Sequence, residues 1–570
     1  MDSIIVSVIS NRLRAIGRQM GAVIERSAHS PLLVEGRDFS LGIYTASGVL
    51  IEQTEYIPIL GYAAAPGVKA VVEYFKGDVH EGDVFLHNDP FTGGNQNSDW
   101  KVMKPVFFEG KLFGWTVITA HQADVGGAVP GSYNPYATDL WQEGIRITPV
   151  RIFSKGKKIK DVWDLIMGNI RLPVVGDDIL AMIGGCTVGE KELVKLIDQY
   201  SMNTVNEAIA EIFDSTEKMA KVIINQIPNG VYDGEWLVMD DGFDHEAEMK
   251  IKVRVTVEDD HMHFDFSGTS PQTKGYVNAP LPVTISSVMI SFFMLTEQEI
   301  AHNEAIQRCI SVHVPEGTML NPKFPAASGF GNHLSDQICS AIFIALSKAL
   351  PEQVTAGWNS LLCAIINGTD EKRQKPFVDI LLNGSKGGSG GTKGADGYDH
   401  IGLIASGGAL AAQDPEMFEL TLPVTLQKYE YAKDSCGAGE WRGGLGVEVE
   451  FSINADGVQA SVFGDGGNEA TAAPGILGGT NGAVNTIVLE YPDGRTYKSF
   501  TKDLISDIPK GTIYKQLAGG GGGYGDPKKR PADIVAKEVR YGYISKEYAK
   551  EKYGVVISNE KKGEIVEILR

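Results

Sequence analysis

Two clusters of polar side chains hold most of the groups in this sequence that can bind a metal ion or transfer a proton. The first runs from His87 to Asp99 (HNDPFTGGNQNSD) and the second from Ala120 to Gly127 (AHQADVGG). Carboxylate oxygens and a neutral imidazole are common ligands of hydrolytic metal sites, and oxygen-rich sets favour magnesium or manganese. Taken alone, His87–Pro90 is more typical of a capped turn than of a ligand set. Two such clusters brought together by the fold favour a functional site.

The stretch between the two clusters has the pattern of a β-hairpin. Pro105–Phe108 and Leu112–Ile118 are apolar runs, and a turn containing Gly110 separates them. Apolar runs that flank a glycine turn predict two antiparallel strands. Such a hairpin places Asp99, just before its first strand, beside His121, just after its second. The sequence therefore predicts that the two clusters meet.

The composition is that of a globular protein with more than one lobe. The 570 residues exceed what a single hydrophobic core usually holds, so we expect two or three lobes. Hydrophobic residues make up 43% and charged residues 22%, as in ordinary soluble proteins. The formal net charge of -20 argues against a nucleic-acid partner, because phosphate binding needs clustered Lys and Arg.

The cysteines and the hydropathy of the sequence indicate the cellular compartment that we expect for this protein. The five cysteines form no CxxC pair, which suits a reducing cytoplasm and argues against a zinc–thiolate site or a disulfide framework. No secretory signal is evident, and no apolar run approaches the length of a membrane span. We therefore expect a cytoplasmic protein that does not associate with membranes.

Hydrophobic periodicity divides the chain into three predicted lobes. Residues 1–228 mix helices and strands, with amphipathic helices predicted over Ile4–Ala28 and Glu190–Lys221. Residues 229–400 begin with a period of two, as expected of an antiparallel sheet, and then turn helical. Residues 401–570 are rich in glycine and end in a helical tail. The predicted fold class is α+β, with mixed α/β lobes, antiparallel sheets and long packing helices.

Three segments of small residues invite closer inspection. Gly384–Gly391 and Leu517–Tyr524 suggest phosphate loops, but neither fits the pattern GxxxxGK[ST]. We interpret both as tight loops packed against a cleft or a partner. A third segment, Pro325–His333, is predicted to be a loop that can face the cleft.

Several short motifs are spread along nearly the whole chain. They are Arg37–Ser40, His87–Pro90, Ala120-His121 with Asp124–Gly127, Pro130–Ser132, Asp434-Ser435 with Gly437–Gly439, Arg442–Gly446 and Gly520–Pro527. With these motifs the chain resembles, essentially end to end, the B-subunit family of ATP-dependent hydantoinases and 5-oxoprolinases. That family also includes subunits of caprolactam-hydrolysing enzymes and of acetone and acetophenone carboxylases. The motifs are specific for the family and not for a substrate.

The resemblance implies a set of metal ligands. It predicts one divalent ion, either manganese, iron or zinc, held by Asp38, Asp99 and His121, with a fourth ligand at the position of Gln96. Members of the family usually have His at that fourth position. The carbonyl oxygen of a glutamine is a weaker ligand than imidazole for transition metals. The presence of Gln96 where the family usually has His therefore affects which metal we expect to bind.

The resemblance also implies the chemistry and the partner. A larger A subunit with an actin-like ATPase fold is expected to use ATP to phosphorylate a small-molecule substrate, and this chain to complete the reaction. A metal lowers the pKa of bound water towards about 7 and so supplies hydroxide near neutral pH. The predicted catalytic residues are His87, Asp89 and Asp124, with His87 or Asp124 as general base or as a group that orients a metal ligand.

Three functions remain open from the sequence. The first is metal-assisted hydrolysis of a cyclic amide such as a hydantoin, a lactam or 5-oxoproline. The second is ATP-dependent ketone carboxylation, which the departure at Gln96 favours and the modest length of the chain disfavours. The third is a structural role in support of the ATPase subunit. In each case we expect a heterotetramer or a larger assembly with the A subunit.

Overall fold

The computed structural model describes the chain except residues 1, 55, 297–299 and 570. The chain divides into two compact units, each built from separate stretches of sequence. Unit 1 comprises residues 1–232, 254–335 and 405–411, and unit 2 comprises 233–253, 336–404 and 412–570. The predicted boundary at 228 lies close to the first division. Unit 2 otherwise combines parts of the second and third predicted lobes.

Unit 1 contains a seven-stranded antiparallel sheet that carries both polar clusters. Its strand order is β2-β1-β5-β4-β3-β6-β7. The strands are β1 (Phe39–Thr45), β2 (Leu50–Thr54), β3 (Val84–His87), β4 (Asp99–Phe108), β5 (Lys111–His121), β6 (Val150–Ser154) and β7 (Lys157–Lys158). The predicted hairpin is confirmed, because β4 and β5 pair from Phe108 opposite Lys111 to Asp99 opposite His121. One hairpin thus joins the end of the first cluster to the start of the second.

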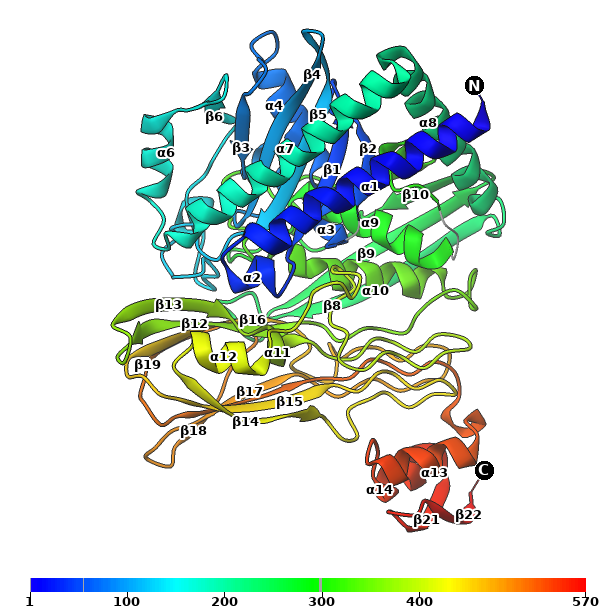
Figure 1. Ribbon diagram of the computed structural model, residues 1–570. Coiled ribbons are helices and arrows are strands. Elements are labelled where there is room, and N and C mark those ends of the chain that lie inside the picture. The colour runs from blue at the N-terminus through cyan, green and yellow to red at the C-terminus, as the bar shows by residue number, and fades with distance from the viewer. Residues whose placement is uncertain (1, 55, 297–299, 570) are drawn as a thin grey trace. The chain divides into compact units, whose positions relative to one another are not determined.

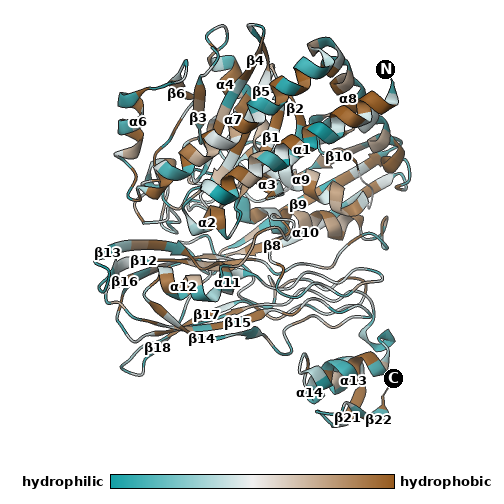
Figure 2. Ribbon diagram, viewed as in Figure 1, coloured by the Kyte–Doolittle hydropathy of each residue, from teal (hydrophilic) through white to brown (hydrophobic). Residues whose placement is uncertain are grey.

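Three long helices belong to the same unit as this sheet. They are α1 (Ser3–Ser27), α7 (Val174–Tyr200) and α8 (Met202–Ile224), and α1 and α7 cross a face of the sheet (Figure 1). The predicted amphipathic pattern of α1 is confirmed. Residues Ile9, Leu13, Ile16, Met20 and Ile24, spaced three or four apart, are buried in the core of this unit. Helices α1 and α7 each show hydrophobic and hydrophilic residues along their length (Figure 2), as expected of helices with one buried face.

The other elements of unit 1 are short helices and part of a second sheet. The helices are α2 (Pro31–Val34), α3 (Pro58–Tyr62), α4 (Ala65–Tyr74), η1 (Pro90–Thr92), α5 (Leu140–Glu143), α6 (Lys160–Met167), α9 (Leu281–Thr296), η2 (Glu304–Arg308) and η3 (Gly331–Leu334). The second sheet, in the order β11-β10-β9-β8, contains β8 (Gly230–Met239), β9 (Glu248–Glu258), β10 (His261–Asp265) and β11 (Ile310–His313). Strands β8 and β9 each cross a division between the units.

Unit 2 is built around two further sheets that share one hydrophobic core. The first has the order β13-β12-β16-β19, with β12 (Leu362–Asp370), β13 (Lys375–Ile380), β16 (Val458–Gly464) and β19 (Asp503–Ile508). The second has the order β14-β15-β20-β17-β18, with β14 (Val424–Tyr431), β15 (Val447–Ile453), β17 (Thr486–Glu490), β18 (Thr496–Lys498) and β20 (Ile513–Ala518). Buried residues of both sheets, including Ile366 and Phe451, form the core.

Helices and a C-terminal module complete unit 2. The helices are α10 (Ser335–Leu346), which starts at the end of unit 1, α11 (Leu382–Ser385) and α12 (Pro415–Thr421). The module contains η4 (Pro527–Lys529), α13 (Ala532–Tyr541), α14 (Lys546–Tyr553), β21 (Val555–Asn559) and β22 (Glu564–Ile568), and it has a small core of its own. The predicted fold class is confirmed. None of the described helices is long and apolar enough to cross a membrane.

The glycine-rich segments of unit 2 pack against one another. The backbone N–H of Gly391 donates to the carbonyl of Gly522 at 2.9 Å, and that of Gly437 donates to Gly521 at 2.8 Å. The N–H of Gly521 in turn donates to Gly444 at 3.0 Å. A Cβ atom added at Gly443 would overlap the carbonyl oxygen of Gly521. Tight packing was expected, and the structure shows that these loops contact each other, which only residues without side chains allow.

Alanine at either of two packed glycines is expected to destabilise unit 2. At Gly443 or Gly521 the new methyl group would meet a backbone carbonyl, which cannot rotate away as a side chain can. Such overpacking typically costs about 1–3 kcal/mol. Gly184→Ala is the control, because a Cβ there meets only Val23 at an ordinary 3.6 Å in the middle of α7. In thermal unfolding, Gly443→Ala and Gly521→Ala should have lower midpoints than the wild type, and Gly184→Ala should not. Equal midpoints for the three variants would contradict this packing.

Candidate functional site

Asp99 and His121 form a buried carboxylate–imidazole pair at the open end of the β4–β5 hairpin. Asp99 Oδ1 lies 2.7 Å from His121 Nδ1, and the two residues are 0% and 6% exposed. Burial disfavours a charged imidazole, but the hydrogen bond and charge of Asp99, together with the charge of Asp38, outweigh it. The pKa of His121 is therefore raised above its ordinary value. The pair is suited to holding or moving a proton.

The second carboxylate oxygen of Asp99 is also engaged. It accepts hydrogen bonds from the side-chain amides of Asn95 and Asn332, the latter at 2.5 Å. Asn95 is oriented in turn by Lys101, whose Nζ donates to Asn95 Oδ1 at 2.8 Å. Burial lowers the pKa of Lys101 to about 8, although the charge of Asp99 opposes the shift. Both oxygens of Asp99 are thus fixed by neighbouring side chains.

Gln96 lies against the same pair and keeps one polar atom unpaired. Its Nε2 is 3.1 Å from His121 Nδ1, 3.0 Å from the Tyr133 hydroxyl and 2.8 Å from Ser98 Oγ. Its Oε1 is buried and has no hydrogen-bond partner among the described residues. The Tyr133 hydroxyl also lies 2.9 Å from His333 Nε2. Because His121 Nδ1 gives its proton to Asp99, Gln96 Nε2 lies beside this nitrogen and donates instead to Ser98 and Tyr133.

Asp38 stands at the edge of this group, just before β1. The backbone N–H of His121 donates to the carbonyl of Asp38 at 3.1 Å, which fixes the two residues side by side. Asp38 is half-buried. Burial raises the pKa of its carboxyl group to about 6; the charge of His121 opposes this shift and that of Asp99 adds to it. The four predicted metal ligands accordingly lie in one neighbourhood.

Comparisons with known proteins agree with the motifs. The family model described as Hydantoinase B/oxoprolinase matches residues 2–527. The chain belongs to this family. The beta subunit of caprolactamase from Pseudomonas jessenii is 32% identical, over 98% of this chain and 96% of its own length. The resemblance drawn from the sequence is confirmed.

Two solved structures share the fold. The crystal structure of ATP-dependent caprolactamase from Pseudomonas jessenii has a TM-score of 0.91 at 31% identity, covering 98% of this chain and 97% of that one. A nucleotide-free acetone carboxylase has a TM-score of 0.90 at 20% identity, covering 99% and 81% of the two chains. The second likeness shows the fold alone. Hydantoinase B/oxoprolinase folds therefore occur in both hydrolases and carboxylases.

The donor types of this hydantoinase B/oxoprolinase site suit a divalent ion, whereas their arrangement is that of a hydrogen-bonded cluster. In the described part of the chain, no three His, Cys, Asp or Glu side chains are grouped to hold a metal. Asp99 and His121 bond to each other instead. The unpaired Oε1 of Gln96 and the carboxylate of Asp38 are oxygen donors of the kind that hard divalent ions take. The types of donor atom in these residues therefore fit a divalent ion. That such an ion binds here stays a prediction.

Asp124 lies buried at the centre of a loop. Its carboxylate accepts hydrogen bonds from the backbone N–H groups of Gly126, Gly131 and Arg171, and from the Arg171 guanidinium at 3.1 Å. These contacts hold the segment that leads to Tyr133. This arrangement favours a structural role, and the catalytic role of Asp124 remains a prediction.

His87 is paired with Lys101 where β3 lies beside β4, and Asp89 follows two residues later. Asp89 caps η1 through Phe91 N and Thr92 Oγ1 and pairs with Arg146 at 2.8 Å, so the capped-turn interpretation is confirmed for this residue. His87 Nε2 lies 2.9 Å from Thr92 Oγ1. Burial, reinforced by the charge of Lys101, lowers the pKa of His87 to about 3, so its imidazole is neutral at physiological pH. The predicted catalytic roles of both residues stay predictions.

Sequence reasoning missed four members of the site. Asn95, Tyr133, Asn332 and His333 all touch the Asp99–His121 pair or its immediate neighbours. Asn95 lay inside the first cluster, and Asn332 and His333 lay in a loop predicted to face the cleft. Nothing in the local pattern identifies which side chains of that loop reach Asp99. Only the folded chain joins positions that lie more than 200 residues apart.

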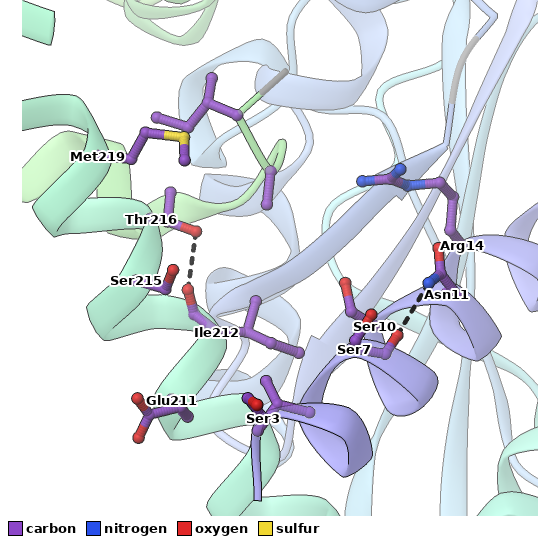
Figure 3. Close-up of a pocket in the computed structure, with 13 residues that line it drawn as sticks. Ser3, Ser7, Ser10, Asn11, Arg14, Glu211, Ile212, Ser215, Thr216 and Met219 are labelled. Carbon is purple, nitrogen blue, oxygen red and sulfur yellow. Dashed lines mark hydrogen bonds between the residues drawn. The ribbon is translucent and has the colours of Figure 1, made fainter. Parts of the chain in front are cut away.

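A groove lined by both polar and apolar side chains lies elsewhere in unit 1, between α1 and α8 (Figure 3). It has a volume of about 470 Å³, and its lining includes Ser7, Ser10 and Arg14 of α1 and Glu211 and Ser215 of α8. None of the predicted site residues lines it. The groove is therefore separate from the Asp99–His121 pair.

Glu143, at the end of α5, is a buried acid whose environment strongly favours the protonated form. Burial raises its pKa to about 8; hydrogen bonds from the backbone N–H groups of Ser328 and Gly329 oppose the shift, and the charge of Asp139 adds to it. In the unfolded chain the same group ionises near its ordinary value of 4.5. Between these two pH values the folded protein holds a proton that the unfolded chain has lost. Glu143 therefore makes folding less favourable as pH rises through this range.

Glu143→Gln is expected to become more stable relative to the wild type as pH rises from 5 to about 8. The neutral amide removes the proton linkage, which for one group amounts to at most about 1.4 kcal/mol for each pH unit. Unfolding midpoints of both proteins at pH 5 and at pH 8 measure the difference. A constant difference between the two pH values would show that Glu143 is already ionised in the folded protein.

Proposed function

We propose that this chain is the catalytic B-type subunit of an ATP-dependent cyclic amide hydrolase. Its substrate would be a hydantoin, a lactam or a ring like that of 5-oxoproline, activated by phosphorylation on a partner A-type subunit with an actin-like ATPase fold. The observation that carries the proposal is the buried Asp99–His121 pair. Family membership and the end-to-end similarity to the caprolactamase beta subunit support the substrate class.

The pair can perform acid–base chemistry on an activated ring carbon. Asp99 fixes the imidazole through Nδ1, which leaves Nε2 as the nitrogen that can exchange a proton with water or substrate. A water that attacks the activated carbon must lose a proton, and His121 in its neutral form can accept it. The cationic form, stabilised by Asp99, can then return that proton to the ring nitrogen as the C–N bond breaks. One residue thereby serves both steps. The phosphoryl group stays on the former carbonyl oxygen as an acyl phosphate, and a second water hydrolyses it to carboxylate and inorganic phosphate.

If Asp38, Gln96, Asp99 and His121 hold a divalent ion, His121 Nε2 is a ligand, and His87 or Asp124 would take its place as general base. Binding of that ion is the second form of this proposal. Bound there, the ion would supply Lewis-acid polarisation of the substrate. The remaining side chains act without it. Asn95 and Asn332 hold the carboxylate of Asp99, and the Tyr133 ring stacks beside the His121 ring, with centroids 5.9 Å apart.

The partner is proposed on the same grounds. The caprolactamase relative is by name one subunit of a larger enzyme, and we expect a heterotetramer or a larger assembly with an A-type subunit. Size-exclusion chromatography with light scattering on the co-expressed proteins measures the stoichiometry. Co-elution is the expected result, and a B chain that elutes alone at every concentration counts against the proposal.

The assembled enzyme should hydrolyse a cyclic amide in an ATP-dependent manner. The decisive assay supplies ATP with caprolactam, hydantoin or 5-oxoproline and measures ring-opened product and released phosphate. Ketone carboxylation is the second candidate, favoured by the departure from the family's usual His at Gln96 and tested with acetone and bicarbonate in parallel. An assembly that consumes acetone and none of the amides is a carboxylase. Inactivity of this chain's site variants in an otherwise active complex would exclude a purely structural role.

The isolated chain is expected to show no ATPase activity. Neither of its segments Gly384–Gly391 and Leu517–Tyr524 has a Gly-Lys pair followed by Ser or Thr, as a phosphate loop does. In the structure most glycines of both segments pack against backbone. Phosphate release by the purified single chain, compared with the assembled enzyme, tests this. Robust ATP turnover by the single chain would show that this chain binds the nucleotide. It would contradict the assignment of ATP to the A-type subunit.

A further inference from the structure

We propose that Glu143 is a positioning residue whose carboxyl group fixes the loop Pro325–His333 and so holds Asn332 and His333 against Asp99 and Tyr133. The residue lies outside the acid–base pair, and its two hydrogen bonds are to the backbone of Ser328 and Gly329. Its contact with the loop is direct and buried. The activity part of the test below rests on the proposed function, and the structural part does not.

Glu143 binds two consecutive backbone groups of the loop. It is 1% exposed, and its Oε1 accepts hydrogen bonds from the N–H of Ser328 at 2.8 Å and of Gly329 at 2.6 Å. A Cβ atom at position 329 would lie only 3.0 Å from Oε1, so glycine is what allows the backbone to approach so closely. Buried backbone donors left without an acceptor are costly. One oxygen atom thus fixes the middle of the loop.

The same loop carries two side chains into the site a few residues later. Asn332 Nδ2 donates to Asp99 Oδ2 at 2.5 Å, and His333 Nε2 lies 2.9 Å from the Tyr133 hydroxyl. Only two residues separate Gly329 from Asn332, and the short turn of η3 begins between them at Gly331. A shift of the backbone at Ser328 and Gly329 is therefore transmitted to both contacts.

Other contacts of the α5 segment hold only the start of the loop. The N–H of Leu140 donates to the carbonyl of Pro325 at 3.0 Å, and Asp139 forms an isolated β-bridge with Ala326. The Phe324 ring meets the Trp141 ring edge to face, with centroids 5.5 Å apart. Phe324 and Trp141 are both exposed. Nearer the site, Asn278 Nδ2 donates to the Ala327 carbonyl at 2.9 Å and the Phe330 N–H donates to the Tyr276 carbonyl at 3.3 Å. Between these two points, Glu143 accepts from Ser328 and Gly329.

A second role for Glu143, as a proton donor, must be separated from this one. Its Oε2 is buried without a hydrogen-bond partner among the described residues, and the same holds for Ser328 Oγ. Positioning requires the reach of Oε1, whereas proton donation requires a carboxylic acid. Glu143→Gln keeps the reach and removes the acid, and Glu143→Asp keeps the acid and shortens the reach. The two substitutions therefore give opposite results under the two roles.

Hydrogen exchange of the full chain tests the positioning role without any substrate. In Glu143→Asp and Glu143→Ala, the amides of Ser328 and Gly329 should exchange about tenfold faster or more, because they lose their acceptor. Glu143→Gln should stay within about twofold of the wild type. Ser328→Ala is the matched control, since it removes the hydroxyl and leaves the backbone N–H in place. Unchanged exchange in Glu143→Asp, or equally fast exchange in Glu143→Gln, overturns the proposal.

Kinetics of the assembled enzyme provide the second readout. Glu143→Asp should lower kcat by roughly 10- to 100-fold with a smaller change in KM, the scale expected for a misplaced catalytic neighbourhood. Glu143→Gln should keep most of the activity, and loss of activity in Glu143→Gln alone would assign the acid role instead. If Glu143→Ala fails to fold, Gly329→Ala presses on Oε1 from the loop side and should likewise speed exchange. A wild-type complex inactive on every amide refutes the proposed function, while the exchange data still decide the role of Glu143.

Discussion

Replacing His121 or Asp99 with alanine is expected to lower kcat of the assembled enzyme by about 100-fold or more. A positioned acid–base group contributes typically about 10²–10⁴-fold, and His121 is a buried imidazole of this site whose pKa is raised. Asp99 acts through His121, because its Oδ1 fixes the ring and stabilises the cation. Steady-state rates at saturating ATP and cyclic amide measure both variants. Similar losses from each substitution are the mark of a pair that works as a unit.

Two controls separate chemistry from folding in this experiment. Asp99→Ala also leaves the amides of Asn95 and Asn332 without their acceptor, so unfolding midpoints must accompany the rates. Asp99→Asn preserves the shape while removing the charge and should lose nearly as much activity as Asp99→Ala. His400→Ala removes another imidazole with two hydrogen bonds, in unit 2, and should keep its activity. Wild-type rates in a folded His121→Ala variant would exclude this residue from the chemistry.

The part of the site that the sequence predicts is the part built from local signals. The β4–β5 hairpin follows from two apolar runs about a glycine turn, and the pairing of Asp99 with His121 follows from the hairpin. The contact of Asn332 with Asp99 spans 233 residues. No periodicity or turn signal encodes a contact of that range. It forms because Glu143 and its neighbours hold the loop there, and those interactions involve backbone groups common to every residue.

The division of the chain into two units shows the same limit of prediction from local sequence signals, over longer stretches of the chain. Hydrophobic periodicity detects a change from helical to strand spacing near residue 229, and the first division of the structure falls close to it. The return of residues 254–335 and 405–411 to unit 1 depends on which surfaces pack together, and composition carries no record of that. In the same way, the abundance of glycine between 384 and 525 indicates close approach of backbone without naming the partner. Gly443 and Gly521 have no room for a Cβ atom, because each lies against the backbone of another segment.

Gln96→His is expected to raise the affinity for a transition metal by about 10- to 100-fold. This is the scale on which groups around a metal tune its binding. The change replaces an amide by an imidazole, which iron and zinc bind more strongly. The position is apt, because Gln96 Nε2 already lies 3.1 Å from His121 Nδ1 and its Oε1 is buried without a partner among the described residues.

Metal binding by wild type and variants can be measured on the isolated chain, without substrate. Each protein is stripped with a chelator, titrated with manganese or zinc, passed through a desalting column and analysed for metal. Gln96→His should retain about one ion per chain, the wild type less at the same free concentration, and Asp99→Ala or His121→Ala least. Gln96→Asn, which keeps an amide on a shorter side chain, controls for a change of packing alone. If Gln96→His binds no more tightly than wild type, or if both ligand deletions leave the metal content unchanged, an ion at these four residues has no part in the mechanism. The Asp99–His121 pair would then be left to act through its proton alone.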